Sequence, residues 1–212
     1  DDISLVLIDY QTLTSDAWFD NNVEKMCSIA ASMATLAFNT AWRKNVDKWA
    51  AERIPEWYDG GTNNPDGVDQ NYLKQAEIYT SRFDRVLFDA RAFNVPKEEV
   101  MNCLIWRQQD ATRNSIQSAG QANFSHKQLM GKSCNEIQDM LFTEKGINWN
   151  DYPSSCKRGT CCIKKPLTFD AKDSRGKVVG ICSRNKWVID TEIPIFNREP
   201  NYINSRVFVG DV

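Results

Sequence analysis

The sequence is poor in histidine, in long apolar runs and in cysteine pairs. Its only histidine, His126, lies in a polar stretch, which excludes a Ser-His-Asp or Cys-His catalytic centre. No run of about 18 apolar residues occurs, which excludes a membrane-spanning helix. An initiator methionine and a basic leader are also lacking, so we expect that residues precede Asp1 and that residues 1–8 are not a signal peptide.

The seven cysteines match neither a disulfide framework nor a zinc-binding motif. No CxxC pair is present, and the adjacent Cys161 and Cys162 would point to opposite faces of a strand. We therefore expect reduced thiols and a cytoplasmic protein. A zinc cluster formed by these two residues with Cys156 is the less favoured alternative.

Basic residues gather in one part of the chain. Between Lys157 and Lys186 there are nine basic and two acidic residues, a net charge of +7. The whole chain has a net charge of −2, so the remainder carries −9. Such asymmetry is typical of a phosphate-binding surface, and a solvated basic hairpin would give the same pattern.

The first half of the chain has the pattern of a strand, a long helix and a polar loop. The strand is predicted over 1–10, the helix over 16–44 and the loop over 55–69. Ser15 or Asp16 would cap the helix. Small and apolar residues recur along it with the spacing of one buried stripe: Val23, Met26, Cys27, Ala30, Ala34 and Ala37.

The second half begins with a predicted strand over 83–95 and a helix over 97–120. A third helix begins with the capping box of Ser133 and Glu136 and ends at Gly146. Short strands are predicted at 160–163, 178–182, 187–189 and 206–209. Helices that cross a largely antiparallel sheet indicate an α+β fold.

Two acids, Asp1 and Asp2, stand at the head of the first predicted strand. A carboxylate at a strand edge is suited to Mg²⁺, which prefers oxygen ligands. Neighbours on a strand point to opposite faces, so only one of the two can easily face a given cleft. The alternative interpretation is a solvated chain end.

Two further groups of polar residues suit contacts with phosphate. Arg107, Asp110 and Asn114 share one helix face at positions i, i+3 and i+7. They indicate either nucleotide recognition or a surface ladder of Arg–Asp pairs. The segments 146–150 and 157–160 offer amides, an aromatic ring and paired cations, although an ordinary connection would look the same.

Four motifs follow one another along the chain: Phe-Asp-Ala-Arg at 88–91, Trp-Arg-Gln-Gln-Asp at 106–110, Phe-Thr-Glu-Lys-Gly-Ile-Asn-Trp-Asn at 142–150 and Lys-Arg-Gly-Thr at 157–160. Their order and spacing resemble the tRNA-histidine guanylyltransferase family, which carries similar segments. The likeness extends over about 1–163. It is closest to the bacterial and archaeal guanylyltransferase-like proteins, which restore truncated 5′ ends of tRNA.

The resemblance implies a fold and a reaction. Residues 1–156 would form a catalytic domain like the palm of ordinary polymerases, lacking its N-terminal part, and 157–212 a basic, β-rich segment. With two Mg²⁺ ions, a nucleoside triphosphate such as ATP or GTP would activate the 5′ end of a tRNA. The 3′-hydroxyl of an incoming nucleotide would then attack, which adds nucleotides in the 3′–5′ direction.

The resemblance also implies roles for individual residues. Asp1 matches a metal-binding aspartate and Asp2 the acid beside it, so both are expected to be catalytic. Asn22, Lys25 and Arg91 are the expected nucleotide-binding residues. The expected tRNA contacts are Arg107, Arg113, Asn114, Asn148, Lys157 and Arg158.

The sequence departs from the family in two places. The first metal-binding aspartate, which the family carries on an Asp-Gly strand ahead of the position of Asp1, is absent, so we expect this chain alone to be inactive. The eukaryotic enzymes carry His-Ile-Asn-Asn where residues 112–115 are Thr-Arg-Asn-Ser. This difference favours repair of tRNA 5′ ends over dedicated recognition of histidine tRNA.

Two further functions are weighed against the nucleotidyltransferase. A tRNA- or RNA-binding module without catalysis is the main alternative, because the first metal-binding aspartate is absent. A palm-type nucleotidyl cyclase is disfavoured, because a GGDEF-like turn is lacking. The remaining expectations are association into a homo-tetramer and no contact with membranes.

Overall fold

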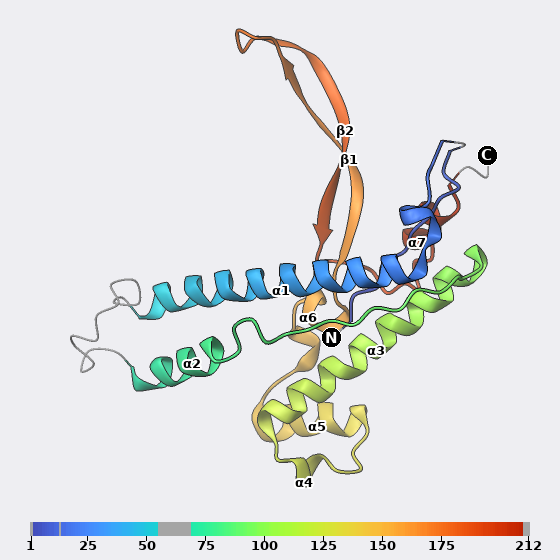
Figure 1. The fold of residues 1–212 in the computed structure, drawn as a ribbon. Coiled ribbons are helices and arrows are strands. Elements are labelled where there is room, and N and C mark those ends of the chain that lie inside the picture. The colour runs from blue at the N-terminus through green and yellow to red at the C-terminus, as the bar shows by residue number, and fades with distance from the viewer. Residues whose placement is uncertain (1, 13, 55–68, 210–212) are drawn as a thin grey trace. The chain divides into compact units, whose positions relative to one another are not determined.

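The computed structural model describes residues 2–12, 14–54 and 69–209 (Figure 1). The predicted loop over 55–69 therefore lies almost wholly outside the described residues, as does Asp1. The chain divides into two units, one made of residues 7–94 and the other of residues 1–6 with 95–212. None of the described helices is apolar over a length that could cross a bilayer.

The smaller unit contains a long helix that begins later than the sequence predicts. A 3-10 turn, η1 (Trp18–Asn21), precedes helix α1 (Val23–Arg53). The side chain of Asn22 caps α1 by accepting a hydrogen bond from the Lys25 N–H over 3.0 Å. The prediction of a helix over 16–44 was wrong at both ends. Residues with positive φ inside η1 cannot continue a right-handed helix, and α1 continues past residue 44 to Arg53.

The predicted stripe along α1 is only partly buried, since Val23 and Ala37 are exposed. The buried residues of α1 are instead Asn39, Val46 and Ala50. The described part of this unit contains no strand for the stripe to pack on. Its core is formed by α1 and a second helix, α2 (Gln70–Thr80), through Ala50, Ile54 and Ala76, with Trp49, Tyr72 and Leu73 packed against them.

The strand predicted over 83–95 is not formed, and residues 85–96 have no regular secondary structure. Side chains of α1 bind this backbone: Asn39 Nδ2 donates to the Val86 carbonyl over 2.8 Å, and Thr35 Oγ1 accepts from the Phe88 N–H over 3.0 Å. A strand requires a neighbouring strand as hydrogen-bonding partner. Here helix side chains take that place, which explains why a β-rich sequence stays irregular.

The larger unit is organised around α3 (Lys97–Asn123), followed by the short α4 (His126–Leu129) and by α5 (Cys134–Lys145). The predicted limits of α5 are confirmed, since Ser133 and Glu136 form the capping box and Gly146 ends the helix with a φ of 65°. Hydrogen bonds from the Ser133 backbone, from Lys132 and from the Ser133 hydroxyl lower the pKa of Glu136 to about 2.

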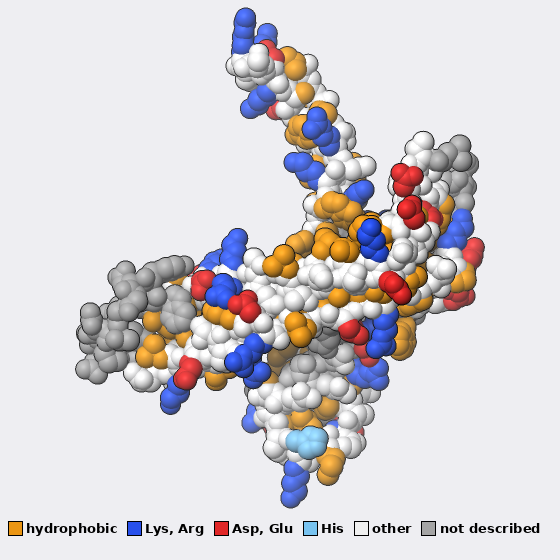
Figure 2. All heavy atoms as spheres, in the orientation of Figure 1, with side chains coloured by type: hydrophobic (Ala, Val, Ile, Leu, Met, Phe, Trp, Pro, Cys, Tyr) orange, Lys and Arg blue, Asp and Glu red, His pale blue; other side chains and the backbone are white. Residues whose placement is uncertain are grey.

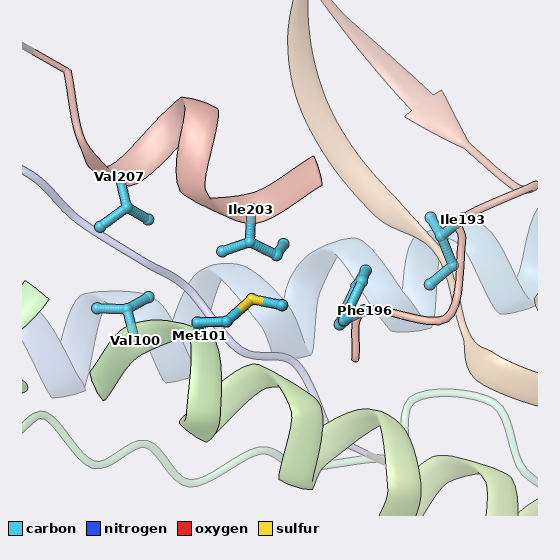
Figure 3. Close-up of a cluster of buried hydrophobic side chains, with 6 residues drawn as sticks. All are labelled: Val100, Met101, Ile193, Phe196, Ile203 and Val207. Carbon is cyan, nitrogen blue, oxygen red and sulfur yellow. The ribbon is translucent and has the colours of Figure 1, made fainter. Parts of the chain in front are cut away.

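Two hydrophobic clusters hold the larger unit together. Figure 3 shows the first, in which Val100 and Met101 of α3 face Ile203 and Val207 of the C-terminal helix α7 (Asn201–Val207). The prediction of a strand over 206–209 was therefore wrong, because Val207 packs on α3 as part of a helix and residues 208–209 form a bend and a turn. The second cluster joins α3 to α5 through Ile116, Ala119, Phe124, Ile137 and Leu141.

The described sheet is a two-stranded antiparallel hairpin of β1 (Cys161–Lys172) and β2 (Val178–Asp190). The strand predicted at 160–163 lies at the start of β1, apart from Thr160. The two strands predicted at 178–182 and 187–189 are parts of the single strand β2. Figure 2 shows Lys and Arg side chains beside apolar ones along it. At its base Asp190 accepts hydrogen bonds from Lys165 and Tyr202, each over 3.1 Å, and the bond from Lys165 lowers the pKa of the Asp190 carboxyl.

The described residues thus form a mixture of helices and antiparallel sheet, which confirms the α+β class in its coarse form. Residues 2–8 pair with no other described strand, so the strand predicted over 1–10 is not formed there. A palm-like sheet covered by long helices and lacking its N-terminal part stays a prediction, as does the division into 1–156 and 157–212.

Gln108, in the Trp-Arg-Gln-Gln-Asp motif, joins α3 to the segment ahead of α7. Its side chain is buried, with the residue only 7% exposed. The amide Nε2 donates to the Pro194 carbonyl over 2.9 Å, and Oε1 accepts from the Phe196 N–H over 3.0 Å. One side chain therefore satisfies two backbone groups of a segment that has no regular structure of its own.

Replacing Gln108 by alanine should leave these two backbone groups without their partners. We expect the free energy of unfolding to fall by about 1–3 kcal/mol, measured by urea denaturation. The neighbouring Gln109 is exposed, so the control variant Gln109→Ala should change the free energy of unfolding by less than about 0.5 kcal/mol. Equal losses in the two variants would contradict the role given to Gln108.

Candidate functional site

One face of α3 carries a series of alternating charges. The Arg107 guanidinium forms an ion pair with the Asp2 carboxylate and lies 3.7 Å from Asp110 Oδ2. Arg113 Nη2 donates to Asp110 Oδ1 over 2.6 Å, and Asn114 Nδ2 donates to Oδ2 over 3.4 Å. The structure thus brings together the residues that the sequence places on one helix face, and it adds Asp2 to them.

The two arginines of this face differ in how far they are available to a ligand. Asp110 lies between Arg107 and Arg113 and offsets their charge. The Arg107 side chain is 26% exposed and also pairs with Asp2, whereas that of Arg113 is 57% exposed. The surface ladder of Arg–Asp pairs is therefore present. Contact of these residues with tRNA stays a prediction.

The described residues do not form a site that fits Mg²⁺. Asp1, the expected metal ligand, lies outside them, and the carboxylate of Asp2 faces a guanidinium. Within 2–12, 14–54 and 69–209, no three His, Cys, Asp or Glu residues group closely enough to hold a metal ion, so no zinc cluster is found there either. All seven cysteines are free in this structure.

The Gly-Ile-Asn-Trp-Asn segment forms a short 3-10 turn, η3 (Trp149–Asp151), after α5. Asn148 caps this turn, with its Oδ1 accepting from the Asn150 N–H and its Nδ2 donating to Asp151, each over 3.1 Å. Trp149 Nε1 donates to Ser115 Oγ of α3 over 3.0 Å. Asn148, expected to contact tRNA, therefore has a clear structural role.

The predicted contacts Lys157 and Arg158 end the short helix α6 (Ser154–Arg158). Lys157 Nζ donates to the carbonyl of Asn150 and lies 5.7 Å from the centroid of the Trp149 ring system. Arg158 Nη2 donates to Ser154 Oγ over 3.1 Å. Its Nε is buried and, within the described part of the chain, has no hydrogen-bond partner.

A pocket of about 320 Å³ lies between α5 and η3. Its α5 wall consists of residues spaced i, i+3, i+4 and i+7, which share one helix face. Four of the lining residues carry side-chain amides, one a carboxylate and two aromatic rings. They are Asn135, Gln138, Asp139, Phe142, Asn148, Trp149 and Asn150.

The expected nucleotide-binding residues lie in the smaller unit. Asn22 and Lys25 come together at the start of α1, and Lys25 Nζ lies 5.0 Å from the centroid of the Phe19 ring. Arg91 lies in the irregular segment, with its guanidinium 3.6 Å from the Asp89 carboxylate and both side chains almost fully exposed. The structure brings the first two residues together and pairs Arg91 with an acid.

Sequence reasoning missed the pocket and the structural role of Gln108. The spacing of Asn135, Gln138, Asp139 and Phe142 was visible as a helix face. Its other wall comes from η3, however, and no local sequence signal indicates that this turn lies beside α5. Gln108 and Gln109 are neighbours on α3 with the same side chain. Gln108 is buried because the segment around Phe196 packs on its side of the helix, whereas Gln109 is exposed.

Comparison with known proteins finds relatives that are named as tRNA guanylyltransferases or as proteins like them. No protein-family model matches it. The probable tRNA(His) guanylyltransferase of Drosophila melanogaster is 29% identical over 121 residues, which cover 50% of this chain and 42% of that protein. This chain thus spans less than half the length of its curated relative.

Two solved bacterial structures resemble the chain over nearly its whole length. A tRNA(His) guanylyltransferase (Thg1)-like protein in complex with ATP has a TM-score of 0.62 and 35% identity, covering 95% of this chain and 65% of that one. A protein of the same description in complex with GTP has a TM-score of 0.54 and 28% identity, covering 94% and 62%.

The bond between Trp149 and Ser115 joins η3 to α3, beside the packing of Trp149 on the cluster around Ile116. A double-mutant cycle with Trp149→Phe and Ser115→Ala should give a coupling energy of about 0.5–1.5 kcal/mol in the free energy of unfolding. Thermal or urea denaturation of the four proteins measures it. Strictly additive losses would show that the two side chains do not interact.

Proposed function

Because this chain belongs to the tRNA-histidine guanylyltransferase family, we propose that it is a nucleotidyltransferase that adds nucleotides in the 3′–5′ direction to tRNA 5′ ends. The observation that carries the proposal is 35% identity over 95% of the chain to a guanylyltransferase-like structure that holds ATP. Repair of truncated 5′ ends is the favoured task, because Thr112 to Ser115 replace the eukaryotic His-Ile-Asn-Asn.

The start of α1 supports binding of a nucleoside triphosphate. The first N–H groups of a helix are free to bind anions, and the helix dipole favours negative charge there. Lys25 adds a cation in the first turn of this 31-residue helix. Asn22 uses its carbonyl oxygen for the cap and keeps its amide N–H groups as donors to phosphate oxygens.

Lys157 and Arg158 are the best supported of the proposed tRNA contacts. The ammonium group of Lys157 has three N–H donors, and the Asn150 carbonyl accepts from one of them. Arg158 Nη2 already donates to Ser154 Oγ and its Nε is buried, so Nη1 is the guanidinium nitrogen proposed to reach a phosphate. Arg107 and Arg113 share their charge with Asp110, so each should contribute less to binding.

We also propose that the reaction needs two Mg²⁺ ions. The described residues alone do not support this requirement. No catalytic step is assigned to a metal, because Asp2 is paired with Arg107 and the described part of the chain holds no cluster of metal-ligating residues. For the same reason we expect this 212-residue chain alone to bind tRNA without extending it. A homo-tetramer and a cytoplasmic location are further proposals.

An RNA-binding module without catalysis is the second candidate function. It is supported by the finding that the described residues, which do not include Asp1, form no group of metal-ligating side chains. It predicts the same tRNA binding as the leading proposal, and it differs only in the absence of nucleotide transfer. The two candidates are therefore separated by an activity assay on the whole gene product with ATP or GTP and a 5′-truncated tRNA.

The role of Lys157 is tested by the salt dependence of tRNA binding. The logarithm of the binding constant K falls as the logarithm of the salt concentration rises. Each phosphate contact that is lost should make this negative slope shallower by about 1. We expect this change for Lys157→Ala, measured by titration of a 5′-truncated tRNA at several KCl concentrations. The control Lys127→Ala removes the same charge from an exposed position of α4 and should leave the slope nearly unchanged.

Three outcomes distinguish the candidates. Extension of the tRNA by the whole gene product supports the nucleotidyltransferase. Salt-dependent binding without extension supports the RNA-binding module. Binding that is weak and independent of salt contradicts both, because phosphate contacts release counterions from RNA.

A further inference from the structure

The pocket between α5 and η3 has the chemistry of a site for a single nucleic-acid base. We propose that it binds a guanine base that is not paired in a duplex, stacked on Phe142 and held at its edge by Asp139. The choice of tRNA as a source of the base rests on the proposed function. The recognition itself rests only on side chains of the larger unit.

Phe142 supplies the stacking surface. It directly follows the buried Leu141 on α5, yet 63% of its surface is exposed. Exposure of an aromatic ring to water is unfavourable, and unpaired bases stack on such rings in RNA-binding proteins. At about 320 Å³ the pocket is near the lower limit for ligand sites, which suits one base rather than a longer segment.

The hydrogen-bonding groups on the same helix face are available to a ligand. Among the contacts of the described residues, none engages the side chains of Asn135 or Asp139, both of which are exposed. The Gln138 amide has only a long bond of 3.5 Å to the Cys134 carbonyl. These three residues and Phe142 lie on one face of α5, so a base that stacks on the ring can also reach polar groups.

The Asp139 carboxylate favours guanine over the other bases. Ionised, it accepts hydrogen bonds with two oxygens and donates none. Guanine presents two adjacent donors, N1–H and N2–H₂, on its Watson–Crick edge. Adenine and cytosine each present one donor beside an acceptor nitrogen, and the single donor of uracil lies between two carbonyl oxygens, so each would place an acceptor against the carboxylate.

A cation stands at the η3 side of the pocket. Lys157 contacts both Trp149 and Asn150, which line that wall. It can therefore pair with the phosphate of a nucleotide whose base enters the pocket. A free phosphate or another small anion is a poor occupant, because the carboxylate of Asp139 would repel it.

The wall opposite Phe142 is fixed before any ligand binds. Asn148 caps η3, and Trp149 is bonded to Ser115 of α3. A wall that is held by its own hydrogen bonds loses little freedom when a ligand binds, which raises affinity. The arrangement therefore suits a site rather than an incidental hollow between two helices.

The base has two possible sources, a free guanine nucleotide or an unpaired guanosine of an RNA. The base preference is tested by measuring the affinity of the chain for GMP, AMP, CMP and UMP, with calorimetry or NMR. Single-stranded oligonucleotides of uridine with and without one central guanosine test the RNA source. We expect GMP to bind at least about tenfold more tightly than the other three, and the guanosine-containing oligonucleotide more tightly than oligouridine.

Two variants test the named contacts. Phe142→Ala should weaken GMP binding by about tenfold or more, since stacking on an aromatic side chain contributes about 1–3 kcal/mol per base. Asp139→Asn should reduce the preference for GMP over AMP, because the amide has one acceptor and one donor group. Both residues are exposed, so the fold should persist, which circular dichroism checks. Phe169→Ala and Asp170→Asn in β1 are matched controls and should leave binding unchanged.

Equal binding of the four nucleotides, or no binding of GMP, would overturn the proposal. So would loss of GMP binding in Lys25→Ala but not in Phe142→Ala, because the binding would then belong to the smaller unit. Tighter binding of GMP than of the guanosine-containing oligonucleotide identifies the free nucleotide as the source. Normal extension of tRNA without any guanine binding would remove this inference and leave the proposed function intact.

Discussion

The position of helix α3 within the larger unit depends on the buried amide of Gln108. Its two ends satisfy the Pro194 carbonyl and the Phe196 N–H, so an irregular segment is held on the helix without leaving buried polar groups unpaired. This segment leads into α7, whose apolar residues complete the core on Val100 and Met101. One face of α3 packs in that core. Arg107, on another face, pairs with Asp2, and Ser115 accepts a hydrogen bond from Trp149.

The charges on α3 show why predicted contacts with RNA should not be treated as equal. Arg107 and Arg113 are close to Asp110, and Arg107 also pairs with Asp2. Lys157 has no acidic partner among the described ion pairs, and it stands beside the aromatic ring of Trp149. Electrostatic attraction of a polyanion should therefore concentrate at the end of α6. The face of α3 is better suited to hold Asp2 in place than to bind phosphate strongly.

The sequence predicted those elements whose limits depend on neighbouring residues. Helix α5 was predicted correctly because its capping box and its terminal Gly146 are local signals. The segment 83–95 was not, because Asn39 and Thr35 of α1 bind its backbone, and that contact is remote in sequence. The motifs indicated the same family that the relatives' names give, and α3 brings Arg107, Asp110 and Asn114 together. The pocket could not be predicted, since it needs the packing of η3 beside α5.

We propose that the larger unit binds tRNA chiefly through the end of α6, at Lys157 and Arg158, and less through the charged face of α3. A 5′-truncated tRNA with photoreactive groups, cross-linked to the protein and analysed by mass spectrometry, tests this most directly. We expect cross-linked peptides that contain Lys157 or Arg158. Cross-links restricted to α3 or to the β1–β2 hairpin would contradict this proposal.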